Sequence, residues 1–182
     1  MRIAVIIPVK SFTVAKGRLS DTLTATQRQE LAQSCAESVV MAARSFHTYV
    51  ACSDSTVASW AISHGAHVVH CPTPGLDAAV AASRLAAQHD GFTHVIVAHA
   101  DLPLAETFQH IAQEGTVTAV ADRHRDGTNV LSFPIDSTFV TGRDSLTFIL
   151  IDTDSLELNT VLTIRYDRIA HIIANSQNGI HV

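Results

Sequence analysis

The sequence predicts an α/β domain built on a largely parallel sheet, and three observations lead to this prediction. Short apolar runs that favour strands alternate with longer segments that favour helices. The first run, residues 2–9, is almost continuous in branched apolar residues, which is typical of a strand buried on both faces of a parallel sheet. The 182 residues are 47% hydrophobic and contain no Pro-rich or Ser-rich linker, so we expect one domain, residues 1–182, with a full core.

The first part of the chain contains three predicted strands and two predicted helices. The opening strand is followed by a polar, basic loop over residues 10–24, and a helix then begins near Thr24 or Thr26. Strands are expected at 48–52 and 67–70, with a helix between them that Ser53 or Asp54 caps. Apolar residues recur at helical spacing in the first helix and predict its core-facing stripe, namely Leu31, Cys35, Val39 and Ala42.

The second part of the chain begins as regularly as the first and becomes harder to assign after Pro134. An alanine-rich helix over 76–89 precedes a buried strand over 93–98. A further helix is expected to start at Pro103, with Glu106 in its first turn. Strands are expected at 116–121 and 129–133, followed by a helix at 145–150, strands at 161–166 and 169–174, and a frayed end.

Composition disfavours several classes of protein. The 12 Lys and Arg against 17 Asp and Glu give a net charge of −5, which disfavours a basic nucleic-acid-binding protein. No apolar stretch reaches the roughly 18 residues that a membrane-spanning helix needs. The N-terminus is typical of a strand rather than of a secretion signal. We therefore expect a cytoplasmic protein that binds neither nucleic acid nor a membrane.

The three cysteines and 11 histidines show no spacing typical of a disulfide framework or a metal site. Cys35, Cys52 and Cys71 include no CxxC pair, so we expect reduced, mostly buried thiols. The histidines form no HExxH motif, and although His67 and His70 lie close in sequence they have no acidic neighbours. Metal binding by the histidines stays open as an alternative.

Polar residues that directly follow predicted strands are the first candidates for a functional site, because ligands of parallel α/β sheets bind beyond the carboxyl ends of the strands. Lys10, Lys16 and Arg18 lie in the loop after the first strand, and such a group of cations suits phosphate groups. Asp101 follows the strand at 93–98 and is suited to holding Mg²⁺ near a triphosphate. The alternatives are a solvated basic loop and a helix N-cap, respectively.

A second candidate segment is the charged loop that leads into the strand at 129–133. Its glycine, Gly127, permits close approach of the backbone to a ligand. Thr128 and Asn129 offer a hydroxyl and an amide group to an anionic or polar ligand. The alternative is an ordinary turn between two strands.

Several motifs together resemble one family of enzymes. They occur in order between residues 3 and 146 as PVK, AKGRL, GLDAA, ADLP, DGTN and GRDS. This combination resembles the 2-phospho-L-lactate guanylyltransferases, some of which are phosphoenolpyruvate guanylyltransferases. The resemblance implies a single three-layer, Rossmann-like domain similar to the molybdenum-cofactor nucleotidyltransferases. It also implies transfer of GMP from GTP to a small phosphorylated acid, with release of pyrophosphate, in the biosynthesis of a deazaflavin coenzyme.

The resemblance also implies roles for particular residues. Lys10, Lys16 and Arg18 would hold the GTP phosphates, and Asp101 would hold Mg²⁺, with Mn²⁺ as an alternative metal. The implied partners are GTP and a small phosphorylated acid, and a homodimer is an open alternative to a monomer. Six further positions match substrate-binding residues of the family, with Thr128, Gly142 and Ser145 on the acceptor: Gly75, Asp77, Thr128, Asn129, Gly142 and Ser145.

The sequence departs from the family pattern at two places. Asp77 stands where the family usually has Asn, which would alter contacts to the nucleotide. The family typically ends with an Asp-Ile-Asp element that supplies a second metal-binding carboxylate, and the corresponding residues 169–175 contain no acid. Two alternatives therefore stay open: a nucleotidyltransferase with another nucleotide or acceptor, such as 3-phosphoglycerate, and a relative that binds nucleotide without catalysis.

Overall fold

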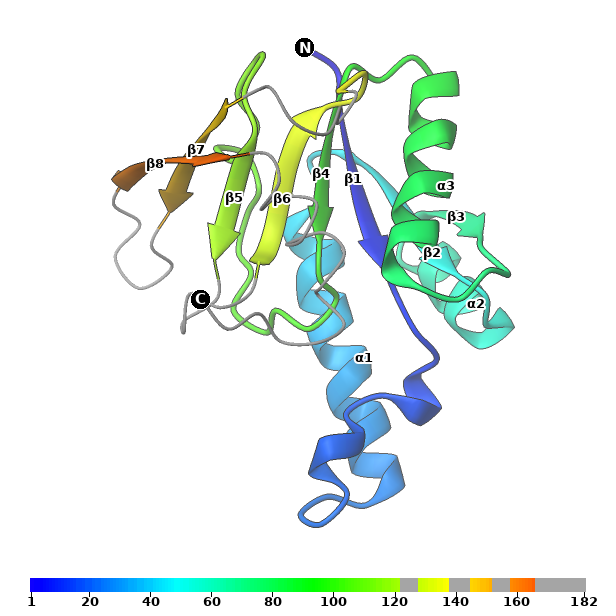
Figure 1. Cartoon of the computed structure of the whole chain (residues 1–182). Helices are drawn as coiled ribbons and strands as arrows, with labels where there is room; N and C mark the ends of the chain where they lie inside the picture. Colours follow the sequence, from blue (N-terminus) through cyan, green and yellow to red (C-terminus); the bar gives the residue numbers. More distant parts are fainter. Residues whose placement is uncertain (122–127, 138–144, 152–157, 166–182) are drawn as a thin grey trace.

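Eight strands join in one sheet in the part of the chain that the computed structural model describes, residues 1–121, 128–137, 145–151 and 158–165. The strands are β1 (Ile3–Pro8), β2 (His47–Cys52), β3 (His67–His70), β4 (His94–Ala98), β5 (Thr118–Ala121), β6 (Thr128–Pro134), β7 (Ser145–Ile151) and β8 (Leu158–Arg165). Their order is β3-β2-β1-β4-β6-β5-β7-β8 (Figure 1). All run in one direction except β6, which is antiparallel to β4 and β5, and β8, which is antiparallel to β7.

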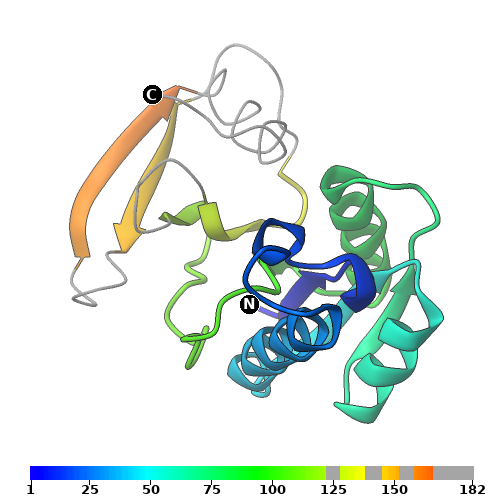
Figure 2. The same ribbon diagram turned by 90° about the horizontal axis from the view of Figure 1, so that it is seen from below.

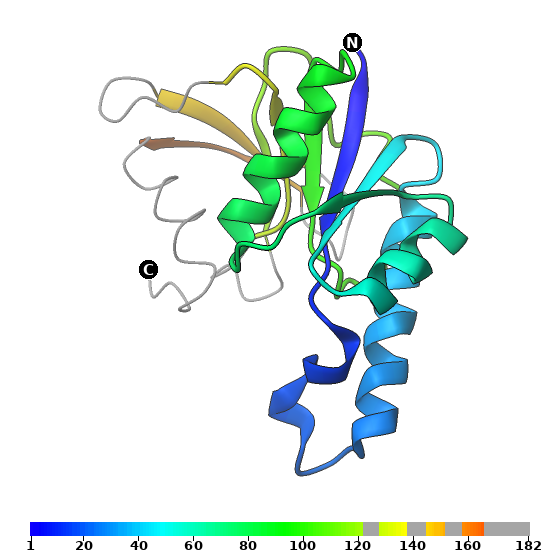
Figure 3. The same ribbon diagram turned by 90° about the vertical axis from the view of Figure 1, so that its right-hand side faces the viewer.

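Three α-helices within the described residues pack on the two faces of this sheet. They are α1 (Ala25–Ala42), α2 (Ser55–Ser63) and α3 (Leu76–His89), and two short 3-10 turns, η1 (Phe12–Val14) and η2 (Gly17–Leu19), precede them. α1 and α2 cover one face and α3 covers the other (Figures 2 and 3). On β1, Val5 and Ile7 pack with α1 and α2, whereas Ala4 and Ile6 pack toward α3. The predicted three-layer α/β fold with a largely parallel sheet is therefore confirmed.

The first α-helix begins where the sequence predicts, because Thr24 caps it. The Gln27 N–H donates to Thr24 Oγ1 over 3.3 Å and the Thr24 N–H donates to Gln27 Oε1 over 3.0 Å, so both bonds of a capping box are present. The predicted core-facing stripe is wrong at one residue, since Leu31 is 37% exposed. The buried stripe begins at Ala32 instead, because the first turns of α1 reach past the edge of the sheet (Figure 1).

The other elements between residues 2 and 98 agree with the prediction to within one residue at each end. Asp54 caps α2 by accepting the Thr56 N–H over 2.8 Å. The three cysteines are buried and free, as expected. None of the helices in the described ranges is long and apolar enough to cross a membrane.

Two helix predictions are wrong. No helix begins at Pro103, because the segment between β4 and β5 passes through turns and buries Phe108 in the core on the side of α1. Residues 145–151 form β7 and pair with β8, which agrees with their branched and aromatic composition. The predicted strand at 169–174 and the frayed end lie outside the described residues.

Candidate functional site

The direction of strand addition reverses between β1 and β4, and this switch point marks one place at the carboxyl edge of the sheet. From β1 the chain moves outward through β2 to β3, and it then returns to place β4 on the other side of β1. The loops that leave the carboxyl ends of β1 and β4 both pack in the core cluster on the α1 side of the sheet. Ligands of open α/β sheets bind beyond the carboxyl ends of the strands at such a switch point.

Lys16 and Asp101 meet at this switch point. Lys16 lies between η1 and η2 in the loop after β1, and Asp101 lies just beyond β4. Lys16 Nζ is 3.5 Å from Asp101 Oδ2, and the two side chains are 25% and 59% exposed. Lys16 has a φ of 56°, in the left-handed region that disfavours residues with a Cβ atom. The loop thus holds a cation beside a carboxylate just beyond the carboxyl ends of the paired strands β1 and β4.

The loop that carries Lys16 is anchored by an aromatic contact. Phe12 is buried and packs edge-on against Trp60 of α2, with ring centroids 5.2 Å apart. Lys10 and Arg18 lie on either side of this anchor and are both exposed. Neither forms an ion pair within the described part of the chain. Both cations are therefore available to an anionic ligand at the same edge.

The carboxyl end of β4 is paired with the beginning of β6. The backbone N–H of His99 donates to the Asn129 carbonyl oxygen over 3.0 Å, so the ladder between the two strands continues one step past β4. Thr128 is paired with Ala121 at the carboxyl end of β5. The structure thus brings Thr128 and Asn129 to the same edge of the sheet as Asp101.

His99 is a residue of this edge that sequence reasoning does not select. Burial lowers the pKa of His99 below its ordinary value, and the Asp101 carboxylate partly opposes that shift. A signal is present in the sequence, because a histidine stands between two alanines directly after a buried strand. Only the pairing with Asn129 shows that His99 lies beside the residues that begin β6.

The amino end of α3 reaches the same edge. Gly75 is the N-cap of α3 with a φ of 119° and a ψ of 149°, a conformation that glycine adopts without steric cost. Asp77 lies in the first turn of α3 and is exposed. A carboxylate at a helix N-terminus stabilises the helix, so a structural role accounts for Asp77 as well as a ligand contact does.

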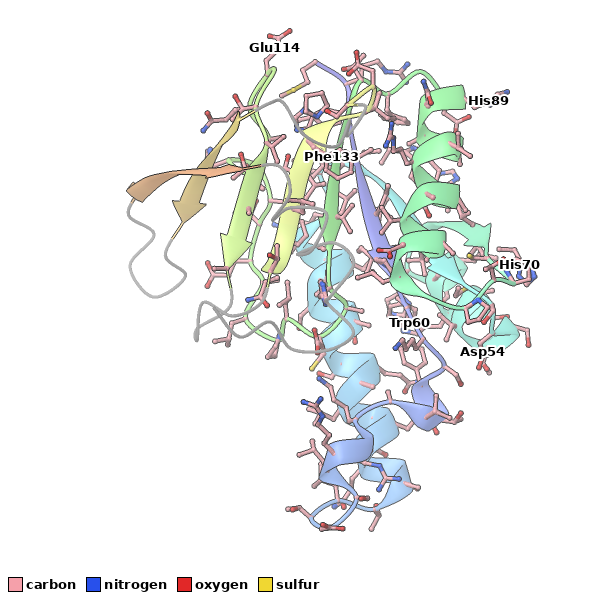
Figure 4. All side chains as sticks on the ribbon, in the orientation of Figure 1. Asp54, Trp60, His70, His89, Glu114 and Phe133 are labelled. Carbon is pink, nitrogen blue, oxygen red and sulfur yellow. The ribbon has the colours of Figure 1, made fainter. Side chains whose placement is uncertain are left out.

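Asp54 adds a fixed negative charge at the carboxyl end of β2. Hydrogen bonds from Ser11, and then from Thr56, hold the pKa of Asp54 at about 2. Figure 4 shows Asp54 at the carboxyl edge of the sheet and His89 at the opposite edge. Because Ser11 belongs to the loop after β1, this carboxylate also ties that loop to α2.

One predicted substrate-binding residue, Ser145, lies away from this edge, and a second, Gly142, is not among the described residues. Ser145 is the first residue of β7 rather than part of a turn, and β7 runs parallel to β5 with Leu150 opposite Ala119. Ser145 therefore lies toward the amino ends of the parallel strands, away from Thr128. Gly142 lies outside the described residues.

Asp101 is the residue that fits Mg²⁺ best at this edge. Its partly exposed carboxylate supplies oxygen ligands, which this cation prefers. Within the described ranges no group of three or more His, Cys, Asp and Glu side chains could hold a metal ion. Mg²⁺ is commonly bound through one or two carboxylates together with substrate phosphates and waters. Asp101 could therefore hold Mg²⁺ together with phosphate oxygens and waters.

Comparisons with known protein sequences show similarity to one family of transferases. Residues 3–149 match the model of the family "Guanylyl transferase CofC like". The chain is 30% identical over 159 residues to a phosphoenolpyruvate guanylyltransferase of Chloroflexus aggregans (strain MD-66 / DSM 9485), covering 79% of this chain and 78% of the relative. It is 32% identical over 145 residues to a phosphoenolpyruvate guanylyltransferase of Mycolicibacterium gilvum (strain PYR-GCK), covering 71% of this chain and 66% of that relative.

Solved structures show the same fold at low sequence identity. A Desulfovibrio desulfuricans G20 protein assigned as a nucleotide-diphospho-sugar transferase matches with a TM-score of 0.64 and 14% identity, over 76% of this chain and 66% of that chain. A cytidylyltransferase from Leptospira borgpetersenii serovar Hardjo-bovis (strain JB197) matches with a TM-score of 0.50 and 12% identity, over 74% of this chain and 61% of that chain. At these identities the likeness establishes the fold alone.

Proposed function

We propose, since the chain belongs to the family of guanylyl transferases like CofC, that it transfers a guanylyl group from GTP to a small phosphorylated acid. The acceptors that we propose are phosphoenolpyruvate and 2-phospho-L-lactate, in the biosynthesis of a deazaflavin coenzyme. The observation that carries the proposal is the pair of Lys16 and Asp101 at the switch point of the sheet, 3.5 Å apart. A cation and a carboxylate in this place suit a triphosphate and its divalent cation, respectively.

The reaction that we propose is one displacement at phosphorus. A phosphate oxygen of the acceptor bonds to the α-phosphorus of GTP while the bond from that phosphorus to the bridging oxygen breaks, and pyrophosphate leaves with the electron pair. The acceptor phosphate is already anionic, so no side chain has to remove a proton from it. Catalysis of this kind depends mainly on positioning and on neutralising charge.

In the proposed reaction, some residues of this chain bind the nucleotide phosphates and others contact the acceptor, on opposite sides of the α-phosphate. Lys10, Lys16 and Arg18 bind the phosphates of GTP and offset the charge of the departing pyrophosphate. Asp101 orients the nucleotide by holding its divalent cation. When bound, Mg²⁺ supplies further neutralisation of the phosphate charge. Thr128 offers a hydroxyl group to the acceptor at the carboxyl end of β5.

Pyrophosphate release tests the proposal. The chain is incubated with GTP, Mg²⁺ and one acid at a time, namely phosphoenolpyruvate, 2-phospho-L-lactate or 3-phosphoglycerate, and the product is identified by mass. We expect pyrophosphate and a guanylylated acid with at least one of the first two acids. Parallel reactions with CTP or ATP detect a different nucleotide preference.

The same experiment, together with calorimetric titration by each nucleoside triphosphate, separates the alternatives. Turnover only with 3-phosphoglycerate or only with another nucleotide would replace the proposed substrates and keep the reaction class. Binding of GTP without turnover, at every concentration of Mg²⁺ or Mn²⁺, would indicate a nucleotide-binding relative without catalysis. Failure to bind any nucleoside triphosphate would overturn the assignment of this edge of the sheet as a nucleotide site.

A further inference from the structure

We infer that His99 is a specificity-determining residue that contacts the carboxylate of the acceptor acid. The inference rests on the proposed function, because it names a contact made by the acceptor of that reaction. Neither the motifs of the sequence nor the family resemblance points to this residue. It follows from the pairing of β4 with β6 and from the direction in which the displacement must run.

The register of the two strands determines where His99 lies. Val97 and Leu131 are opposite each other and pack in the same core cluster, on the face of the sheet that α3 covers. His99 comes two residues after Val97, and Asn129 comes two residues before Leu131, so His99 lies opposite Asn129. The His99 N–H donates to the Asn129 carbonyl oxygen over 3.0 Å. Since side chains alternate between faces, His99 belongs to the α3 face at the carboxyl edge. The amino end of α3, with Gly75 as its cap, reaches that same edge.

The β6 strand is irregular at the same point. Against β5, Val120 is opposite Val130 and Ala121 is opposite Thr128, so Asn129 is an extra residue in the ladder. Bulges of this kind redirect a side chain and are frequent beside active sites. Asn129, which lies opposite His99 on the β4 side, therefore has no opposite residue on the β5 side.

His99 keeps hydrogen-bonding capacity that the described residues do not use. Its side chain is half-buried, and neither ring nitrogen has a hydrogen-bond partner within the described part of the chain. His94, the first residue of β4, does have a side-chain partner, because its Nε2 is 2.8 Å from Ser132 Oγ. An imidazole carries at least one N–H donor in either protonation state, and an unused donor at the carboxyl edge of the sheet is suited to an anionic oxygen.

The geometry of the displacement places the acceptor on this side. Attacking and leaving oxygens lie roughly in line on opposite sides of the α-phosphorus. The cations that would hold the departing pyrophosphate lie on the loop after β1. The acceptor phosphate therefore approaches from the other side of Asp101, which is where β6 pairs with β4. A carboxylate attached near that phosphate would lie within reach of His99 and Asn129.

The experiment compares acceptors with and without a carboxylate in matched variants. Wild type, His99→Leu and His99→Gln are assayed by pyrophosphate release with phosphoenolpyruvate, 2-phospho-L-lactate and glycerol 3-phosphate, which lacks the carboxylate. GTP binding is measured by calorimetry in each variant. His89→Leu is the control, because it makes the same change at an exposed histidine on the opposite edge (Figure 4).

We expect His99→Leu to raise the KM for the acid acceptors by roughly 10- to 100-fold, the range for losing one hydrogen bond to a charged group. The KM and the affinity for GTP should stay within about twofold of wild type, and the preference for acids over glycerol 3-phosphate should fall by the same factor as the acid KM rises. His99→Gln, which keeps an N–H donor, should recover most of the loss. His89→Leu should match wild type.

Three outcomes would overturn the inference. An unchanged KM for the acids in His99→Leu would do so, as would a loss confined to GTP affinity, or an equal loss with glycerol 3-phosphate. If wild type releases no pyrophosphate with any acid, the proposed reaction fails. Calorimetric binding of phosphoenolpyruvate in the presence of a GTP analogue with a methylene bridge between the α- and β-phosphates then decides the role of His99. Equal binding by wild type and His99→Leu, or none by either, would also refute the role of His99.

Discussion

Replacing Lys16 by glycine tests whether the loop after β1 keeps a strained backbone in order to place a cation. Lys16 has a φ of 56° and a ψ of 32°, a conformation that costs about 1–2 kcal/mol for a residue with a Cβ atom. Glycine avoids this cost, but its freedom in the unfolded chain removes about 0.4–1 kcal/mol of the gain. Loss of the ion pair with Asp101 costs at most about 1 kcal/mol, because both side chains are partly exposed.

Alanine at the same position is the matched control, because Lys16→Ala loses the same ion pair and keeps the Cβ atom. The free energy of unfolding of Lys16→Gly should exceed that of Lys16→Ala by about 0.8 kcal/mol, the difference between the midpoints of these two ranges. In a chain of this length the difference corresponds to roughly 1–4 °C in Tm. Both variants should bind GTP roughly 10- to 100-fold more weakly than wild type, since each lacks the same charged contact to phosphate.

Urea unfolding followed by circular dichroism measures the first difference, and calorimetric titration with GTP measures the second. If Lys16→Ala is as stable as Lys16→Gly, the backbone at residue 16 carries no strain. If both variants bind GTP as wild type does, Lys16 does not belong to the nucleotide site. The two results are independent, so the structural and the functional part of the reasoning can fail separately.

Three further predictions follow from the same structure. Arg18→Ala should weaken GTP binding by about 1–3 kcal/mol, because this exposed guanidinium has no acidic partner in the described ranges; equal affinity by calorimetry would exclude Arg18 from the site. Asp101→Asn should raise the Mg²⁺ or Mn²⁺ concentration needed for turnover, and activity unaffected by the change would refute Asp101 as the metal ligand. The free energy of unfolding should fall as the pH drops below 6.5, because burial lowers the pKa of His94 in the folded chain and the unfolded chain then binds the proton more tightly. Urea unfolding between about pH 7.5 and 5.5 measures this loss, and a smaller loss is expected for His94→Gln; a flat profile in wild type would contradict it.

Periodicity predicts the elements before residue 98 well, and the reason is local. Each of these strands is a short apolar run between turn-forming residues, and α1 and α2 begin at capping side chains, Thr24 and Asp54. The same reasoning fails at Pro103, where a residue typical of a helix start is followed by a segment that packs through Phe108. Helix propensity is a weak local preference, and burial of one aromatic side chain outweighs it.

The candidate site is predictable only in part, because its contacts join distant segments. The edge of the sheet that carries Lys16 and Asp101 follows from the rule that ligands bind beyond the carboxyl ends of parallel strands. The position of β6 between β4 and β5 has no local signal, since strand order depends on which long-range pairings form. His99 can therefore be recognised as a site candidate only through its pairing with Asn129, a residue 30 positions away in the sequence.

Because β1 lies inside the sheet, the nucleotide site can form only after distant parts of the chain have paired with it. β1 pairs with β4, and the Arg2 N–H donates to Thr93 Oγ1 across 91 positions of sequence. On a ribosome the lysine-bearing loop would emerge long before the strand that completes its site, at about 5–20 residues per second. Contacts of such long range form slowly because the intervening chain must first be ordered. We expect nucleotide binding to be among the last properties gained during refolding, so its appearance would report the docking of β4 beside β1.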